Sequence, residues 1–352
     1  MKDSIFQEDL SFLGYYIDGH KSLHGKSIFI TGATGLVGSM IVKSIILANK
    51  EHGTAIKVIA LVRDTDKMAA LYDGFDLSDV TLIKGDLGMD LTAVIDDGVD
   101  YIIHTASPTA SKFFVEHPVE TLGIAIDGTR NVLELARVKQ VKGMVYLSSM
   151  EAFGNVPSAV GRAAEDDLGY IDIHSVRSSY SEGKRVCELL CSCYAAEYGV
   201  NVKIARLAQT FGAGIPYGEN RVFAQFAKSV INKQDIVLHT AGKSYGNYVY
   251  TMDAVTAILL LLIKGENGEA YTVANEESNI TIGDMARLVA HELANDEIEV
   301  VFDIPESALT YGYAPDVELH LSSQKLQALG WKPTVGLIDS YKRMMESMLA
   351  TR

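Results

Sequence analysis

A tyrosine and a lysine four residues apart are the first pair whose spacing suggests chemistry. Tyr180 and Lys184 stand in the stretch SSYSEGKRV, residues 178–186, and residues four apart share one face of a helix. A lysine ammonium beside a tyrosine lowers the pKa of the phenol, and the phenolate can then take a proton from a substrate hydroxyl. Such pairs also arise by chance on helices, so this one needs support from elsewhere in the chain.

The order of residues along the chain gives that support. Ser149 ends the apolar run GMVYLSS at residues 143–149, and Tyr180 opens a helical pattern that follows. A serine at the end of that strand would bind the same substrate oxygen as the tyrosine. We therefore interpret Ser149, Tyr180 and Lys184 as catalytic, and expect the last two to contact a nicotinamide cofactor as well.

A glycine-rich turn predicts where that cofactor binds. Gly32, Gly35 and Gly38 form G-x-x-G-x-x-G between an apolar run at 26–31 and a helical pattern that opens at Leu36. Glycines permit a tight turn and close backbone approach, and the amino end of a helix offers N–H groups to a pyrophosphate. Three glycines are weak evidence alone, but at the first strand-to-helix junction they predict dinucleotide binding, with Leu36 in the binding turn.

The end of the second apolar run bears on the choice between NAD and NADP. An acidic residue there accepts the ribose hydroxyls of NAD and repels a 2′-phosphate. This chain has Val62 instead, followed by Arg63. An arginine can pair with the 2′-phosphate of NADP, although it can equally stack on the adenine of NAD. Arg63 therefore favours NADP slightly and leaves NAD open.

Further candidates follow the third and fourth apolar runs. Open α/β sheets bind ligands at the carboxyl ends of their strands, so we expect contacts to adenine and ribose there. Ordinary turn chemistry is the alternative explanation for the same residues. The candidates are Asp86, Leu87, Thr105, Ala106 and Ser107.

Apolar strands alternate with helices through the first half of the chain, which predicts an α/β fold with a Rossmann-like, doubly wound parallel sheet covered on both faces. The expected strands are 26–31, 57–62, 80–85, 100–106, 143–149 and 200–207, and the longest helices are 119–138 and 180–199. After Leu207 the alternation loosens. We expect a lead-in at 1–25, a dinucleotide-binding domain at 26–207 to which 247–275 returns, and a smaller substrate domain at 208–246 and 276–352.

Composition excludes several classes of protein. The 352 residues carry a formal net charge of −14, whereas nucleic-acid binding proteins concentrate lysine and arginine. The longest apolar run, AILLLLI at 257–263, is far shorter than the roughly 20 residues that span a membrane.

The start MKDSIFQEDL is acidic where a secretory signal is basic, so we expect a cytoplasmic protein. Three cysteines at 187, 191 and 193 cannot aim at one ion from a single short helix, and we expect reduced thiols and no metal site.

On these motifs the chain resembles the extended short-chain dehydrogenase/reductase family, which includes sugar-nucleotide epimerases, dehydratases and decarboxylases. The resemblance runs through TGATGLVGS, HTASP, YLSSMEAFG, YSEGKR, ARLAQTFGAG and LGWKP, almost the whole chain. It implies NAD or NADP as cofactor, a nucleotide sugar as substrate, and a homodimer built on the helices near 119–138 and 180–198.

Within that family the motifs are most similar to UDP-glucuronate decarboxylases. HTASP, YSEGKR and Arg177, three residues before the tyrosine, carry this similarity. It implies transient oxidation of the sugar C4 hydroxyl. Family dehydratases carry Thr-Asp-Glu where this chain has Ser149, Met150 and Glu151. Methionine cannot donate a proton, so dehydration at C6 is disfavoured, and Glu151 is implied as a catalytic base or is an ordinary solvated side chain.

The implied substrate contacts include departures from the family pattern. Gly246 stands where many relatives have an arginine that grips the diphosphate, and Gln209 stands where they have asparagine. Arg221 is the favoured replacement cation, with Lys243 and Arg206 as others. Tyr248 can stack on a base or sugar, or belong to a half-buried strand. The full set of expected substrate contacts is Ser107, Ser149, Arg177, Gln209, Arg221 and Tyr248.

Three functions remain open on the sequence. The leading one is a redox-cycling enzyme on a nucleotide sugar, either decarboxylase-like or 4-epimerase-like. The second is a net NADPH-dependent ketone or aldehyde reductase, which Arg63 and Gly246 favour. The third is a non-catalytic dinucleotide-sensing protein, which the presence of Ser149, Tyr180 and Lys184 disfavours.

Overall fold

The alternating apolar runs form one parallel sheet. In the computed structural model, which describes residues 3–96, 98–304 and 317–352, seven strands lie in the order β3-β2-β1-β4-β5-β7-β11. Their bounds are β1 Ser27–Thr31, β2 Lys57–Val62, β3 Val80–Lys84, β4 Tyr101–His104, β5 Gly143–Ser149, β7 Val202–Leu207 and β11 Ala270–Val273. The strand order reverses between β1 and β4, and ligands bind beside the carboxyl ends of strands at such a switch point. The predicted Rossmann-like fold is confirmed.

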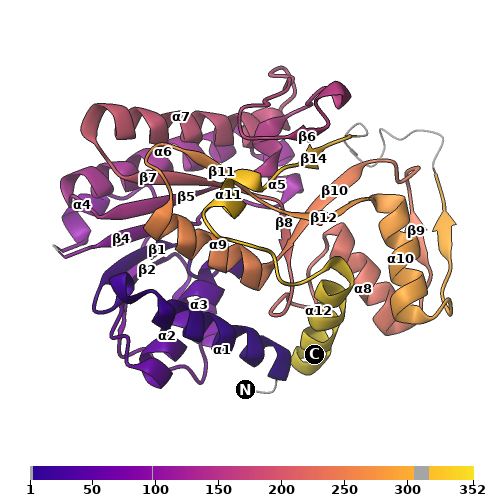
Figure 1. Ribbon diagram of the computed structural model, residues 1–352, viewed down its shortest axis with the longest axis horizontal. Helices are drawn as coiled ribbons and strands as arrows, with labels where there is room; N and C mark the ends of the chain where they lie inside the picture. Colours follow the sequence, from indigo (N-terminus) through magenta and orange to yellow (C-terminus); the bar gives the residue numbers. More distant parts are fainter. Residues whose placement is uncertain (1–2, 97, 305–316) are drawn as a thin grey trace.

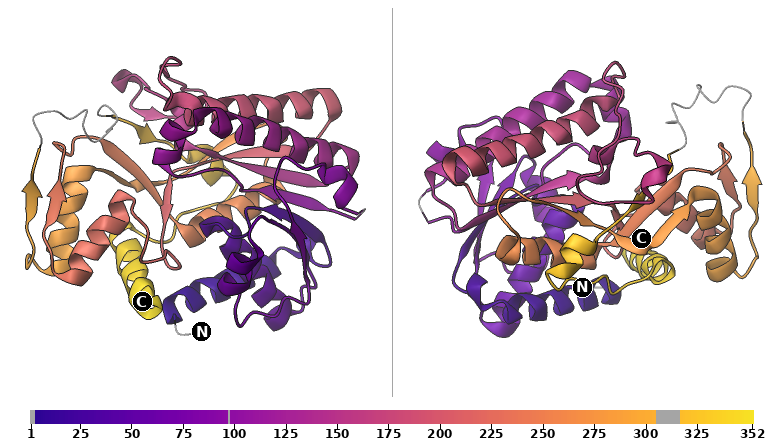
Figure 2. Two further views of the ribbon diagram at one scale, coloured as in Figure 1. Left: turned by 180° about the vertical axis from the view of Figure 1, so that it is seen from behind. Right: turned by 45° about the horizontal axis from the view of Figure 1, so that its top comes forward.

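Helices cover both faces of this sheet (Figure 1). Helices α6 and α7 pack side by side over one face, and α1, α2 and α9 cover the other. Figure 2 shows the same two layers from behind and from above. The bounds in this part of the chain are α1 Ser4–Gly19, α2 Leu36–His52, α3 Thr65–Leu71, α4 Leu91–Val94, α5 Ser111–Glu116, α6 Pro118–Val138, α7 Ser178–Tyr198 and α9 Thr251–Lys264.

The amino-terminal segment packs tightly onto this body. One face of α1 presents apolar residues at helical spacing, and they are buried against α2 and α9. The Asp9 carboxylate, on the same helix, accepts hydrogen bonds from the Tyr250 hydroxyl and the Arg343 guanidinium, each at 2.6 Å. Tyr250 ends a strand of the smaller unit and Arg343 lies in the last helix, so Asp9 connects three distant parts of the chain.

Most of the remaining elements form a smaller unit, whereas the short helix α11 packs on β11 at the edge of the large sheet. Three strands, β8, β10 and β12, make one sheet, and β9 with β13 and β6 with β14 make two pairs. The helices α8, α10 and α12 enclose an aromatic core that contains Phe211, Phe223 and Tyr341. The bounds are β6 Arg162–Ala163, β8 Gln209–Phe211, α8 Val222–Asn232, β9 Ile236–Leu238, β10 Tyr245–Tyr250, β12 Asn275–Thr281, α10 Ile282–Ala294, β13 Val300–Phe302, β14 His320–Leu321, α11 Gln324–Ala328 and α12 Leu337–Thr351.

The segment expected at 247–275 is shared between the two units. Helix α9 packs on the large sheet, and β11 pairs in parallel with β7 as the seventh strand. Strand β10 pairs instead with β8 and β12 in the small sheet. Within the expected substrate domain, residues 305–316 lie outside the described residues. The exact division into domains stays a prediction.

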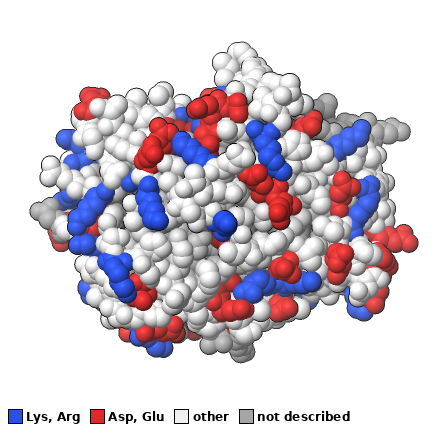
Figure 3. Space-filling model, viewed as in Figure 1, with Lys and Arg blue, Asp and Glu red and all other residues white. Residues whose placement is uncertain are grey.

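Charged side chains of both signs are interspersed over the face of the molecule shown in Figure 3. Such a mixture, with the net charge of −14, gives no broad basic surface on that face for a phosphate backbone. No helix within the described ranges is long and apolar enough to cross a bilayer. The three cysteines lie on α7 as free thiols, Cys187 and Cys191 buried and Cys193 exposed.

Candidate active site

The glycine turn after β1 has the shape that a dinucleotide requires. Gly32 has a φ of +72°, and a Cβ atom there would lie 2.4 Å from the Thr105 hydroxyl oxygen. A Cβ atom on Gly38 would lie 2.3 Å from the Gly32 carbonyl oxygen, so α2 packs against the turn because both residues lack side chains. Gly35 caps α2 without a side-chain hydrogen bond, which leaves the first N–H groups of the helix for an anion. These residues fit a bound pyrophosphate.

Two predicted cofactor residues are exposed where β2 and β3 end. Arg63 directly follows β2 and is accessible to a ligand. Asp86 follows β3, and its carboxylate accepts the Gly88 N–H at 2.8 Å, which is the turn chemistry that we considered as the alternative. Leu87 is buried against α6, where a Cβ atom on Gly128 would lie 2.8 Å from it, so its side chain has a packing role.

The residues after β4 lie beside the glycine turn. The Thr105 hydroxyl donates to the Thr31 carbonyl at 2.7 Å, and the Ala106 N–H donates to the Thr31 hydroxyl at 3.2 Å. These bonds join the carboxyl ends of β1 and β4 directly under the turn. Ser107 is half-buried, and its hydroxyl donates to the Pro108 carbonyl at 3.2 Å. Leu36, at the start of α2, packs against the core of the smaller unit.

The three predicted catalytic residues come together. Tyr180 and Lys184 lie in the first two turns of α7, and Ser149 ends β5 beside them. The Lys184 ammonium donates to the Leu147 carbonyl at 2.7 Å and lies 5.7 Å from the centroid of the Tyr180 ring. The Ser149 side chain lowers the pKa of Tyr180, and its Oγ accepts the Glu151 N–H at 3.2 Å. The arrangement places a phenol, an ammonium and a hydroxyl at the end of one strand.

The electrostatics of this cluster differ from the sequence expectation. Burial raises the pKa of Tyr180 to about 12, with a further increase from Glu151, while Ser149 and two arginines act in the opposite direction. Burial also lowers the pKa of Lys184 to about 8. The expected lowering of the tyrosine pKa is therefore outweighed by desolvation in the protein chain alone.

Phe114 is a site residue that the sequence did not reveal. Its ring stacks on the Tyr180 ring at a centroid distance of 4.2 Å, and its carbonyl accepts the Ser179 hydroxyl at 3.3 Å. Phe114 lies on α5, which directly follows the HTASP motif. This position next to a candidate cofactor segment was the sequence feature that could have indicated Phe114 as a site residue. The side chain is buried and encloses the tyrosine.

Glu151 is held by two neighbours and is not freely solvated. Its carboxylate accepts a hydrogen bond from the Arg177 guanidinium at 2.9 Å and from the Ser181 hydroxyl at 3.0 Å. Arg177 and Ser181 flank Tyr180 in sequence, so the carboxylate lies beside the start of α7. Its negative charge reaches the phenol, since it raises the pKa of Tyr180.

The other predicted substrate residues have different surroundings. Gln209 is half-buried on β8 and pairs in register with Tyr248 on β10. Tyr248 is 1% exposed, and its ring packs against Phe211 in the core of the smaller unit. Arg221 is exposed and forms an ion pair with Glu219 at 2.8 Å. Its positive charge still lowers the pKa of Tyr180.

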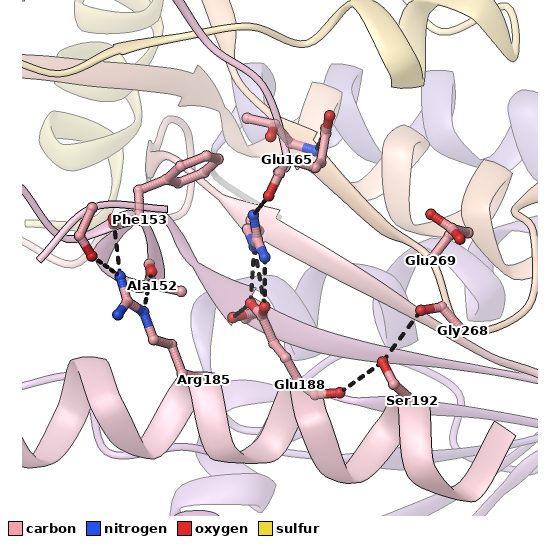
Figure 4. Close-up of polar contacts among 12 residues, drawn as sticks. Ala152, Phe153, Glu165, Arg185, Glu188, Ser192, Gly268 and Glu269 are labelled. Atoms are coloured by element: carbon pink, nitrogen blue, oxygen red, sulfur yellow. Dashed lines mark hydrogen bonds and ion pairs between the residues drawn. The ribbon is translucent and has the colours of Figure 1, made fainter. Parts of the chain in front are cut away.

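A buried ion pair beyond Lys184 was also missed (Figure 4). Arg206 of β7 donates to both carboxylate oxygens of Glu188 on α7, with the shortest contact at 2.7 Å. Arg206, considered above as a substrate cation, is committed to this contact. The pair lines a pocket of about 300 Å³ that also borders Glu269 and Lys325. Apart from Arg206, none of the residues considered for the site lines this pocket, so it is separate from the expected substrate site.

The sheet topology and the smaller unit beside its carboxyl edge define the class, an enzyme of the extended short-chain dehydrogenase/reductase type. The chain belongs to the NAD dependent epimerase/dehydratase family, whose family model matches residues 28–275. The family resemblance drawn from the motifs is thus confirmed.

Individual relatives cover nearly the whole chain. UDP-glucuronic acid decarboxylase 6 from Arabidopsis thaliana is 28% identical over 322 residues, which cover 91% of this chain and 88% of the relative. The fold is similar to UDP-glucose 4-epimerase from Thermotoga maritima solved with UDP-glucose, with a TM-score of 0.75, 22% identity and coverage of 92% and 99%. It is also similar to dTDP-glucose 4,6-dehydratase from Streptomyces venezuelae with NAD bound, with a TM-score of 0.74, 22% identity and coverage of 91% and 96%.

Proposed function

We propose that this protein modifies a nucleotide-activated sugar by transient oxidation of the sugar C4 hydroxyl, with a decarboxylase-like or 4-epimerase-like outcome. The observation that carries the proposal is the meeting of Ser149, Tyr180 and Lys184 at the carboxyl edge of the sheet. The relative named UDP-glucuronic acid decarboxylase 6 and the structural neighbour solved with UDP-glucose support a nucleotide sugar as the substrate.

The cofactor is NAD or NADP, which when bound supplies the hydride acceptor and donor. The glycine turn would hold its pyrophosphate, and Arg63 and Asp86 would lie near its adenosine half. Arg63 favours NADP because a guanidinium pairs with a 2′-phosphate. The structural neighbour with NAD bound supports NAD. We retain both, with NADP slightly ahead.

In this mechanism Tyr180 receives the proton of the substrate hydroxyl, and the Ser149 hydroxyl binds the same oxygen. A phenol with a pKa of about 12 holds its proton at neutral pH, so Tyr180 needs a nearby positive charge to act as a base. Lys184 is the cation on the same helix face, and its pKa of about 8 keeps it mostly charged at pH 7. The pair therefore works as a unit.

Glu151 acts after oxidation. In the decarboxylase-like outcome, the C4 ketone lets the C5–C6 bond break: CO2 leaves, the electron pair is held as the C4–C5 enolate, and C5 then takes a proton, with Glu151 as the acid–base group for that transfer. Arg177 and Ser181 orient Glu151 through the hydrogen bonds described above. Met150 offers no proton to a leaving hydroxyl, which disfavours dehydration.

A net NADPH-dependent ketone or aldehyde reductase is the second candidate. Arg63 favours it, and so does Gly246, because glycine removes the diphosphate-binding arginine of many relatives. Stoichiometry separates the two functions: a redox-cycling enzyme consumes no cofactor, and a reductase oxidises one NADPH per turnover.

We also propose a homodimer built on α6 and α7. Apolar side chains remain exposed on these helices, which is unfavourable in water unless another surface covers them. They are Val119 and Val138 on α6 and Val186 and Leu189 on α7. Sedimentation of wild type and of Leu189→Glu tests this assembly, which is wrong if both sediment as monomers.

The test of the proposed function begins with the purified protein. Denaturation should release NAD or NADP, identified by mass, and incubation with a panel of sugar nucleotides that includes UDP-glucuronate should convert one of them without net change in cofactor absorbance. Stoichiometric NADPH consumption on a simple ketone would instead establish the reductase. Absence of any dinucleotide binding would contradict both.

A further inference from the structure

Two consecutive residues at the end of β5, Leu147 and Ser148, form hydrogen bonds with side chains of α7. The Leu147 carbonyl accepts the Lys184 ammonium at 2.7 Å, and the hydroxyl of Ser148 donates to the Glu188 carboxylate. The next residue is Ser149, whose side chain lowers the pKa of Tyr180. Because Tyr180, Lys184 and Glu188 are spaced four apart, they form one row along the helix. Glu188 is thus the third member of the row that begins with the catalytic pair.

Glu188 is fixed in place from the neighbouring strand (Figure 4). Arg206 binds it through two guanidinium nitrogens, with Nε to Oε1 at 3.0 Å and Nη2 to Oε2 at 2.7 Å. The remaining Arg206 nitrogen donates to the Glu165 carbonyl at 2.6 Å. The side chains of Arg206 and Glu188 are only 5% and 9% exposed. Forked guanidinium–carboxylate pairs fix both position and angle, so Glu188 has one available orientation.

Glu188 is the negative charge that faces Lys184. The titratable groups around the Lys184 ammonium are Cys187, Glu188 and Cys191 on α7 together with Tyr180, Tyr146 of β5 and His104 of β4. Burial keeps both tyrosines and the Cys191 thiol protonated because it raises the pKa of each, and it lowers the pKa of His104 to about 3, which keeps the imidazole neutral. The Cys187 thiol donates to the Ala125 carbonyl. Cys187 and Glu188 both raise the pKa of Lys184, and Glu188, held in a fork by Arg206, is the one carboxylate in this set.

We propose that Glu188, clamped by Arg206, is a positioning residue that keeps Lys184 charged and directed at Tyr180. The inference rests on the proposed function, since it explains how Lys184 remains an ammonium in a buried site. The competing explanation is that Glu188 only ties α7 to the neighbouring strands and has no effect on the charge of Lys184. Buried ion pairs contribute little stability relative to apolar residues of the same volume, so the two explanations differ in what removal of the charge does to Lys184.

The test follows the titration of Lys184 directly. NMR of protein labelled at lysine Cε gives its charge as a function of pH, and the resonance is assigned by its absence in Lys184→Arg. In Glu188→Gln we expect the Lys184 midpoint to fall by about one pH unit or more, because an opposite charge is lost. If that variant fails to fold with an unpaired arginine, Glu188→Gln/Arg206→Gln removes both charges and should show a smaller fall of the same sign, because no unpaired guanidinium then repels Lys184.

Glu182→Gln is the matched control, since it removes another carboxylate of α7 that pairs with an arginine near the surface. Its Lys184 midpoint should equal that of wild type. An unchanged midpoint in the folded Glu188 variants overturns the proposal, even if the enzyme converts a nucleotide sugar and Tyr180→Phe abolishes that conversion. A shifted midpoint in a protein that binds no dinucleotide supports the charge-keeping role and contradicts the proposed function, so the two failures are distinct.

Discussion

Phe114 lies flat against Tyr180, with ring centroids 4.2 Å apart and planes inclined by 11°. The Arg177 guanidinium carbon lies 5.0 Å from the centroid of the same Phe114 ring. Phe114 is 1% exposed, so it keeps water from one side of the phenol. Burial is the largest cause that raises the pKa of Tyr180 to about 12, and this ring is part of that burial.

Phe114→Ala should admit water to the phenol and lower the Tyr180 pKa toward its usual value near 10. Loss of a buried ring should also reduce the free energy of unfolding by about 3–5 kcal/mol. Ultraviolet titration against a Tyr180→Phe reference measures the first effect, and urea unfolding measures the second. Phe113→Ala, on the same helix but half-buried, should change neither strongly. An unaltered Tyr180 titration in Phe114→Ala would exclude the shielding role.

Tyr180→Phe should reduce kcat about 10²–10⁴-fold, because it removes the group that accepts the substrate proton. Cofactor binding should stay within a few-fold of wild type, since the glycine turn is unchanged. Steady-state rates and a fluorescence titration with NADH or NADPH check the two parts. Turnover at the wild-type rate would remove Tyr180 from the mechanism.

Arg63→Ala should weaken NADP about tenfold or more relative to NAD, because a charge-assisted contact to the 2′-phosphate is lost. Calorimetric titration with each dinucleotide gives the ratio. Lys67→Ala, an exposed cation in the next helix, is the control for a general loss of positive charge. Equal weakening of NAD and NADP in Arg63→Ala would show that the arginine does not read the phosphate.

In the decarboxylase-like outcome, Glu151→Gln should oxidise the sugar and then stall, because the amide cannot serve as the acid–base group for the proton transfer that follows oxidation at C4. Single-turnover absorbance at 340 nm should show reduced cofactor that persists instead of decaying. Ser181→Ala removes one hydrogen bond to Glu151 and keeps its charge, so it should slow the second step only a few-fold. Full turnover by Glu151→Gln would refute the base role.

Asp9→Asn should change the dependence of stability on pH. Burial raises the pKa of Asp9 to about 6, above its usual value near 4, so the folded chain binds the proton more tightly than the unfolded chain. The contribution of Asp9 to stability should therefore be greatest below pH 4, fall as pH rises to about 6, and then level, with a total change of up to about 3 kcal/mol.

Urea unfolding at intervals from pH 4 to pH 7 measures this slope, which Asp9→Asn should lose. Asp3→Asn, a conservative change at the cap of the same helix, should keep it. Equal slopes in Asp9→Asn and wild type would assign the pH dependence to other groups.

Much of the fold was readable from the sequence because strands buried on both faces are continuous apolar runs. The alternation predicted six strands of the large sheet and the helices between them, and the seventh strand, β11, lies in the segment 247–275 that was expected to return to this domain. Its pairing with β7 was not readable, since the chain between β7 and β11 passes through β8 and β10 of the three-stranded sheet and through β9, which pairs with β13. Pairing between distant segments leaves no local pattern.

The site was readable where its chemistry depends on local spacing. Tyr180 and Lys184 were found from their separation of four, and Ser149 from its strand. Phe114 was not found, because its stacking on Tyr180 joins distant segments. Arg206 was considered as a cation for the substrate, but the structure commits it to Glu188, four residues after Lys184. The spacing of four residues between Lys184 and Glu188 is visible in the sequence, so this missed contact had a signal in the local pattern.

The packing of Tyr248 limits which residues can stand at position 246. A Cβ atom on Gly246 would lie 2.4 Å from the Tyr248 hydroxyl and 2.6 Å from two of its ring carbons. An arginine at 246 would therefore clash even if Tyr248 were replaced by phenylalanine, because the ring carbons alone occupy the space that a Cβ atom at 246 needs. A smaller residue at 248 has to come first, at the expense of a packed core. The two positions are therefore coupled through packing, because a side chain at 246 requires Tyr248 to move or to be replaced.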